Sequence, residues 1–253
     1  MARGLATVPP GQVAALRPWF VPERPGPLVG LHVINTGNGS LLADRWPRPR
    51  AVLAEVAGNW SLAGDPDALE EADLRGLLAG FVEAPARFLP LLRAAFADLV
   101  LWDRLVFALG GRPRPPPAAG GRVRRLRDDD AGPLGELGEE TAWVAKTWGG
   151  PAGLAASGTG WGAFAGGRPV SVACPFFVGE RYEDVGVATE PGFRGAGLST
   201  ACAAAVCADI LERGRAPSWT TSPDNLASLR VAEKLGFSAV RRDRLYVVGV
   251  PVP

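Results

Sequence analysis

A glycine-rich stretch, Arg194-Gly-Ala-Gly-Leu-Ser199, has the composition of an anion-binding loop. It lies between an apolar run, residues 185–189, and a long alanine-rich segment, so the order is strand, tight turn, helix. Glycines let backbone N–H groups approach a ligand closely, and the helix start supplies the positive end of its dipole. The stretch therefore predicts a phosphate cradle, to which Arg194 would add a charge-assisted contact. The alternative is a turn that only packs a helix against a sheet.

Two familiar phosphate motifs do not fit this stretch. A Walker loop ends in Gly-Lys-Ser or Gly-Lys-Thr, and neither Lys146 nor Lys234 follows a glycine. A dinucleotide fingerprint needs Gly or Ala three positions after its second glycine, where this chain has Thr200.

A second group of polar residues follows a predicted short strand, residues 217–221. Asn225-Leu-Ala-Ser228 opens a predicted helix, and Lys234-Leu-Gly-Phe237 closes it. Gly236 fits the left-handed position past a helix end, and Phe237 fits the hydrophobic contact that accompanies it.

Together the two groups resemble the GNAT N-acetyltransferase superfamily over residues 122–250. Its pyrophosphate loop reads Arg or Gln, two residues, Gly, one residue, then Gly or Ala; Arg194 and Gly197 match, and Ser199 departs from the pattern. Its members also carry Asn, a small residue three positions on, and Lys-Leu-Gly-Phe at the helix end. Trp219, followed by residues 224–225, Ser228 and the helix end, is similar to the zwittermicin-resistance type.

The resemblance implies acetyl-coenzyme A as cosubstrate and a free amine that attacks the thioester directly. The pantetheine amides would pair with the strand as an added strand does, the diphosphate would bind the loop N–H groups, and the second helix would face the pantetheine arm. The implied binding residues are Val187, Ala188, Thr189, Arg194, Gly195, Ala196, Gly197, Leu198, Ser199, Thr200, Asn225 and Ser228.

The acid and the base are less clearly marked. Many superfamily members place a Tyr seven residues after the helix Asn, where this chain has Ala232. Tyr182 or Tyr246, or a water molecule, would have to protonate the leaving thiolate instead. Glu183 is the first candidate for the base and Asp184 the second, and the alternative is that both are exposed strand-end carboxylates.

Strands and helices that would position these residues can be read from the same half of the chain. Residues 159–165 and 168–177 predict a hairpin that turns at Gly166-Gly167, and residues 182–189 predict the next strand. We therefore expect an α+β fold, with an α/β mixed, mostly antiparallel sheet flanked by helices.

The first region predicts a smaller α+β domain. Residues 28–34 are expected to form a buried strand and residues 51–62 a strand pair, with helices in residues 65–80 and 86–99. A proline- and glycine-rich stretch suggests domains at 1–111 and 122–253, joined by a linker at 112–121. The hypothesis for the first domain is selection of the substrate or formation of a homodimer.

Composition bounds the partners and the compartment. The formal net charge of the 253 residues is +1, which argues against nucleic acid or a membrane as partner. The partner that the resemblance implies is a small-molecule amine. One histidine and three cysteines without metal spacing predict no metal. Cys202 is expected on the buried face of its helix and Cys207 off it. Without a targeting segment or membrane span, we expect a cytoplasmic protein.

Three hypotheses follow. The first is an acetyl-coenzyme A-dependent N-acetyltransferase acting on a primary amine of a small molecule or peptide. The second is a catalytically inactive module that binds or senses coenzyme A, suggested by Ala232 and Ser199. The third is a structural two-domain protein in which the glycine loop only turns the chain.

Overall fold

The computed structural model describes residues 4–113 and 122–252. These residues form two compact units, each made of separate stretches of chain. Unit 1 contains the segment ending at Glu23, Val29–Arg104 and the segment from Arg242 onward; unit 2 contains Arg24–Leu28 and Leu105–Arg241. The sequence predicts instead a division at 112–121, and most of that predicted linker lies outside the described residues.

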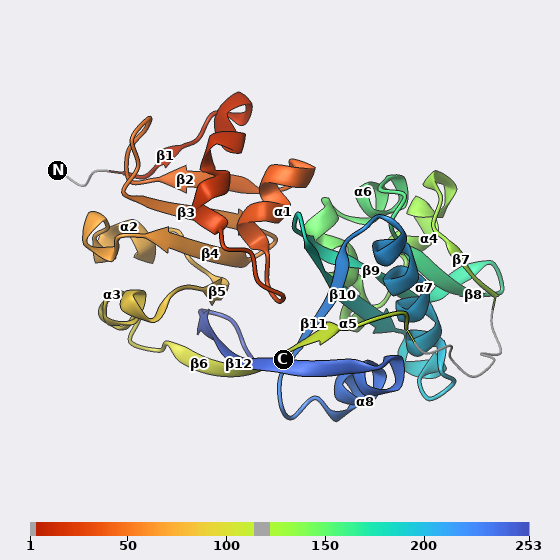
Figure 1. Ribbon diagram of the computed structural model, residues 1–253. Helices are drawn as coiled ribbons and strands as arrows, with labels where there is room; N and C mark the ends of the chain where they lie inside the picture. Colours follow the sequence, from red (N-terminus) through yellow and green to blue (C-terminus); the bar gives the residue numbers. More distant parts are fainter. Residues whose placement is uncertain (1–3, 114–121, 253) are drawn as a thin grey trace. The chain divides into compact units, whose positions relative to one another are not determined.

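Unit 2 is built on a mixed sheet with the order β7-β8-β9-β10-β11-β6 (Figure 1). Its strands are β6 (Val100–Leu109), β7 (Arg122–Arg125), β8 (Trp161–Ala165), β9 (Arg168–Val178), β10 (Tyr182–Thr189) and β11 (Ala216–Thr221). Neighbours are antiparallel except for the parallel pair β10 and β11. The predicted hairpin and the strand at 182–189 are confirmed, and so is the predicted mixed sheet.

Helices cover both faces of this sheet. On one face, α7 (Leu198–Glu212) and α8 (Leu226–Leu235) pack through a core that includes Val185 of β10 and Trp219 of β11. The helices of the other face are α4 (Ala131–Gly135), α5 (Glu139–Ala142) and α6 (Pro151–Ala156), and 3-10 segments lie at Asp128–Asp130 and Trp143–Trp148. Their core contains Val172 and Cys174 of β9. Helix α7 crosses the strands in Figure 1.

Unit 1 has the same strand order as unit 2. Its sheet runs β1-β2-β3-β4-β5-β12, and only the pair β4 and β5 is parallel. The strands are β1 (Ala6–Thr7), β2 (Ser40–Ala43), β3 (Ala51–Val56), β4 (Asn59–Gly64), β5 (Gly80–Glu83) and β12 (Phe237–Val248). The helices are α1 (Val29–Thr36), α2 (Glu71–Arg75) and α3 (Leu89–Ala95), with 3-10 segments at Pro10–Phe20, Pro66–Ala68 and Ala86–Phe88.

The matching order has an unusual connectivity. The strand that follows β11 in the order of unit 2 is β6, which pairs with β11 through Leu105–Ala108 and starts in unit 1. The equivalent strand beside β5 in unit 1 is β12, which pairs through Tyr246–Val248 and starts in unit 2. The first half of the sequence therefore provides β6 to the sheet of unit 2. The second half provides β12 to the sheet of unit 1.

The predicted strand at residues 28–34 is wrong, because these residues lie mostly in helix α1. The run is apolar apart from His32, and a short buried helix and a buried strand give the same signal when polar residues do not recur at a regular spacing. His32 is fully buried in this helix.

Candidate functional site

The strands β10 and β11 pair over only part of their length. Parallel pairing runs from Tyr182 beside Ala216 to Asp184 beside Ser218, although β10 continues to Thr189 and β11 to Thr221. On their outer sides both strands stay paired to these ends, with β9 and β6. The inner edges beyond Asp184 and Ser218 therefore present backbone groups without a strand partner among the described residues. An extended amide-containing ligand could bind there as an added strand.

The glycine-rich loop lies directly after β10. Residues 191–197 are exposed, and Gly195 and Gly197 have left-handed φ values of 82° and 76°. Gly197 is the N-cap of α7, and no side chain caps this helix start. The N–H of Ala201 donates to the carbonyl of Gly197 at 3.1 Å. The N–H groups before it, in the first turn, point out of the helix, which is the arrangement that an anion requires.

Arg194 does not extend over this loop toward the helix start. Its Nε donates to the carbonyl oxygen of Thr189 at 3.2 Å, and its Nη2 donates to Glu140 Oε2 at 2.7 Å. The anion-binding capacity of the loop therefore comes from main-chain N–H groups rather than from this guanidinium.

Asn225 and Ser228 come together at the start of α8. Asn225 Oδ1 accepts from the N–H of Ser228 at 3.0 Å, so Asn225 caps the helix. The Oγ of Ser228 accepts from the indole N–H of Trp219 at 2.9 Å. Trp219 thereby ties α8 to β11, a contact that the sequence alone does not predict.

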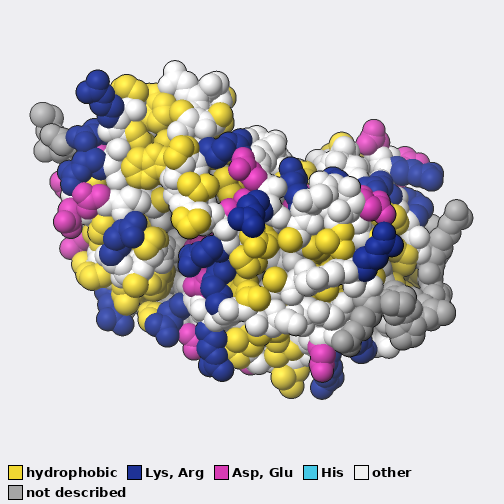
Figure 2. Space-filling model, in the orientation of Figure 1, with side chains coloured by type: hydrophobic (Ala, Val, Ile, Leu, Met, Phe, Trp, Pro, Cys, Tyr) yellow, Lys and Arg dark blue, Asp and Glu magenta, His cyan; other side chains and the backbone are white. Residues whose placement is uncertain are grey.

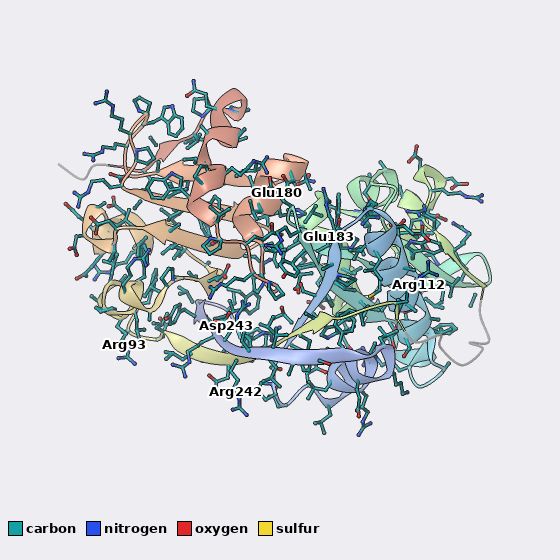
Figure 3. All side chains as sticks on the ribbon, in the orientation of Figure 1. Arg93, Arg112, Glu180, Glu183, Arg242 and Asp243 are labelled. Carbon is teal, nitrogen blue, oxygen red and sulfur yellow. The ribbon has the colours of Figure 1, made fainter. Side chains whose placement is uncertain are left out.

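Glu183, labelled in Figure 3, lies in β10 on the face that is covered by α7. Only 1% of its side chain is exposed. Its Oε2 accepts from Arg213 at 2.6 Å and its Oε1 from Arg215 at 2.7 Å. Arg213 also pairs with Asp209, which Arg125 binds at 2.6 Å. Glu183 therefore belongs to a network of ion pairs at the end of α7, in which the carboxylates are buried and the arginines are partly exposed.

Asp184 points to the opposite face, because successive side chains of a strand alternate. It is 5% exposed, and its Oδ1 accepts from Ser218 Oγ at 2.7 Å and from Thr220 Oγ1 at 3.1 Å. Asp184 and Ser218 form the last pair of the parallel ladder, and the register of β9 and β10 shifts immediately after Asp184. The structure thus places this carboxylate where β10 and β11 part.

The tyrosines do not assemble with the loop. Tyr182 is the first residue of β10, and the guanidinium of Arg181 lies 5.8 Å from its ring centre. Tyr246 is buried in the core of unit 1. Ala232, at the position where the resembling superfamily has its tyrosine, is fully buried in the core of unit 2.

The cysteines are core residues. Burial raises the pKa of the Cys174 and Cys202 thiols to about 12, which removes their thiolate character at neutral pH. Cys207, expected off the buried face of its helix, is fully buried too, since α7 is covered on most sides.

Charges of both signs are interspersed over the surface seen in Figure 2, in keeping with the net charge of +1. Among residues 4–113 and 122–252 no cluster of His, Cys, Asp or Glu has the size of a metal site. No helix in this part of the chain has the length and apolarity needed to cross a membrane.

Comparison with known proteins gives consistent matches. The family model of the GNAT acetyltransferases matches residues 134–246. An uncharacterized N-acetyltransferase from the mutA 5′ region of Streptomyces virginiae is 44% identical over 209 residues, which cover 81% of this chain and 88% of the relative.

Solved structures resemble the fold of nearly the whole chain. A GCN5-related N-acetyltransferase-like protein from Streptococcus suis 89/1591 has a TM-score of 0.71 at 18% identity, covering 94% of this chain and 98% of its own. A tandem GNAT protein from the clavulanic acid biosynthesis pathway has a TM-score of 0.54 at 16% identity, with coverage of 96% and 97%.

Proposed function

Because this chain belongs to the GNAT acetyltransferase family and is an acyltransferase, we propose that it transfers the acetyl group of acetyl-coenzyme A to a primary amine. The observation that carries the proposal is the parting of β10 and β11 beside the uncapped start of α7. The free strand edge of β10 could pair with amides, and the N–H groups at the start of α7 could bind a diphosphate. The two lie next to each other in the chain, as a nucleotide with a pantetheine arm requires.

The residues of the site fit this cosubstrate. The free inner edge of β10 would pair with the pantetheine amides through Val187, Ala188 and Thr189, and the N–H groups from Arg194 to Thr200 would hold the diphosphate. Asn225 and Ser228 would face the arm from α8. When bound, the thioester supplies an acetyl group activated for attack by nitrogen.

Asp184 is the base that the geometry favours. An acceptor ammonium would give one proton to Asp184, and its nitrogen would attack the thioester carbonyl carbon. The C–N bond forms as the C–S bond breaks, and a second N–H proton goes to the leaving sulfur, through water or Tyr182. Glu183, the first candidate from the sequence, has both carboxylate oxygens bound to arginines, which suits a structural role better.

The experiment is calorimetric titration with acetyl-coenzyme A and coenzyme A, followed by thiol release across a panel of primary amines. Binding with thiol release supports the transferase. Binding without release from any amine would favour the inactive sensing module, and absence of binding heat would favour the structural protein.

Finer assignments stay predictions. The zwittermicin-resistance type, the homodimer, the cytoplasmic location and the selection of substrate by the first region each follow from the sequence alone. The amine panel bears on the first of these, because an acceptor antibiotic would have to be among its substrates.

A further inference from the structure

A short segment, Arg24–Leu28, belongs to unit 2 although the chain on both sides of it belongs to unit 1. The N–H of Gly26 donates to Ser218 Oγ at 3.2 Å, and the Arg241 guanidinium donates to the carbonyl oxygen of Pro25. A Cβ on Gly26 would lie 3.0 Å from Arg241 Nη2 and 3.4 Å from Val106 Cγ1. The segment therefore packs closely on β11, β6 and the end of β12 that lies in unit 2.

This packing is on the face opposite α7. Val185 and Trp219 point to the α7 side, where both are buried in the hydrophobic core under α7. Their neighbours Asp184, Ser218 and Thr220 point to the other side. The helices on that side pack on β9 through Val172 and Cys174, whereas the segment covers β11.

The direction of the hydrogen bonds is fixed. Gly26 can only donate through its N–H, so Ser218 Oγ accepts there and its single hydroxyl hydrogen goes to Asp184 Oδ1. The backbone of residue 26 thus determines that Ser218 acts as a donor to the carboxylate. A donor to the charged form stabilises a carboxylate as an anion, which is the state that accepts a proton.

We infer that Arg24–Leu28 forms the acceptor-side wall of the acetyltransferase site, and that Ser218, held by Gly26, is a positioning residue for Asp184. This inference rests on the proposed function. It gives Arg24–Leu28, a segment of the first region, a role in acetyl transfer. That role depends on the backbone N–H of Gly26, which donates to Ser218.

The test is steady-state kinetics of the full-length protein carrying Ser218→Ala, Ser218→Thr and Gly26→Ala. Ser218→Ala should lower kcat about tenfold, leave the KM for acetyl-coenzyme A within about twofold, and be rescued by Ser218→Thr, which restores the hydroxyl. Gly26→Ala should lower kcat similarly, because its Cβ moves the N–H away from Ser218. Ser222→Ala is the control, since Ser222 is also buried, directly after β11, and donates no hydrogen bond to Asp184 among the described contacts.

A double-mutant cycle tests the link between the two residues. If Gly26 acts through Ser218, adding Gly26→Ala to Ser218→Ala should cost little more, whereas full additivity would overturn the inference. Unchanged kcat in Ser218→Ala would also overturn it and leave the transferase function intact. Hydrogen exchange at the Gly26 amide, expected to quicken in Ser218→Ala, reports the contact without turnover. A wild type that released no thiol would refute both proposals.

Discussion

Adjacent carboxylates on β10 face opposite sides of the sheet and have different partners. Glu183 faces α7 and binds Arg213 and Arg215, whereas Asp184 faces the other side and accepts from Ser218 and Thr220. The sequence alone identifies both as candidates for the base. It shows that their side chains point to opposite faces of a strand, but not which residues lie on each face. The arginines lie some thirty positions away in sequence, beyond the reach of any local pattern.

The two carboxylates should respond differently to loss of charge. Asp184→Asn is expected to lower kcat by roughly 10²- to 10⁴-fold with unchanged affinity for acetyl-coenzyme A, because it removes the proton acceptor that we propose. Glu183→Gln should keep kcat within about threefold while destabilising the fold by about 1.5–3 kcal/mol, since it removes the charge that Arg213 and Arg215 share, although Arg213 keeps its pair with Asp209. Thiol release and urea unfolding measure these effects, and the reverse pattern would return the base role to Glu183.

Asp130 predicts a pH dependence of stability. Arg124 binds this buried carboxylate through two hydrogen bonds of 2.7 Å, and these hold the pKa of Asp130 below its usual range. A lowered pKa means that the stabilisation is present above the pKa of the unfolded chain and is lost as the pH falls through the folded pKa.

Asp130→Asn should therefore lower the free energy of unfolding at pH 7 by about 2 kcal/mol. The difference from the wild type should shrink in urea titrations below about pH 4, where the carboxylate of the unfolded chain becomes protonated. Arg168→Gln, which removes an exposed pair with Glu136, is a control expected to change little. A difference independent of pH would contradict the ionic explanation.

Elements whose signals are local were predicted well from the sequence. The loop and helix after β10 follow from glycines with left-handed φ at Gly195 and Gly197, and the hairpin follows from Gly166-Gly167. Helix α1 was missed because burial on all sides removes the periodic pattern. The site was predictable as far as the loop and β10; the segment Arg24–Leu28 was not, because only tertiary packing brings it to β11.

Opposite ends of α7 allow a matched test of the loop. Gly197 and Gly214 both have a φ of 76° and open space around an added Cβ, so a side chain at either position causes similar backbone strain. Gly197→Glu should weaken the binding of acetyl-coenzyme A at least a hundredfold, because its carboxylate would lie where the diphosphate binds. Gly214→Glu should bind normally. Calorimetry distinguishes them, and equal affinities would remove the loop from the site.

At the scale of the molecule, each half of the sequence depends on the other to complete its sheet, because β6 belongs to the sheet of unit 2 and β12 to that of unit 1. Tyr246, Val247 and Val248 of β12 are at most 4% exposed, and Tyr246 and Val248 belong to the core of unit 1. Burial of each such side chain contributes roughly 1.5–3 kcal/mol. Their sum is a large share of the roughly 5–15 kcal/mol that stabilises a typical domain.

A fragment of residues 1–113 should therefore fail to fold cooperatively. Without β12, β5 keeps β4 as a neighbour but loses its strand partner on the other side. The core of unit 1 also loses Tyr246 and Val248. Thermal unfolding followed by circular dichroism should show no sharp transition, and adding a peptide of residues 242–252 should restore one. A sharp transition in the fragment alone would show that the sequence-based boundary at 112–121 separates independent domains.

Synthesis on the ribosome proceeds from the N-terminus, and most multidomain chains fold their first domain while the second is still being made. Here the strand that completes unit 1, β12, follows every other strand of both units along the chain. Unit 1 therefore stays incomplete, with the β12 side of β5 unpaired, until β12 has been synthesised. Unit 2, whose strand β6 is made early, is expected to close first.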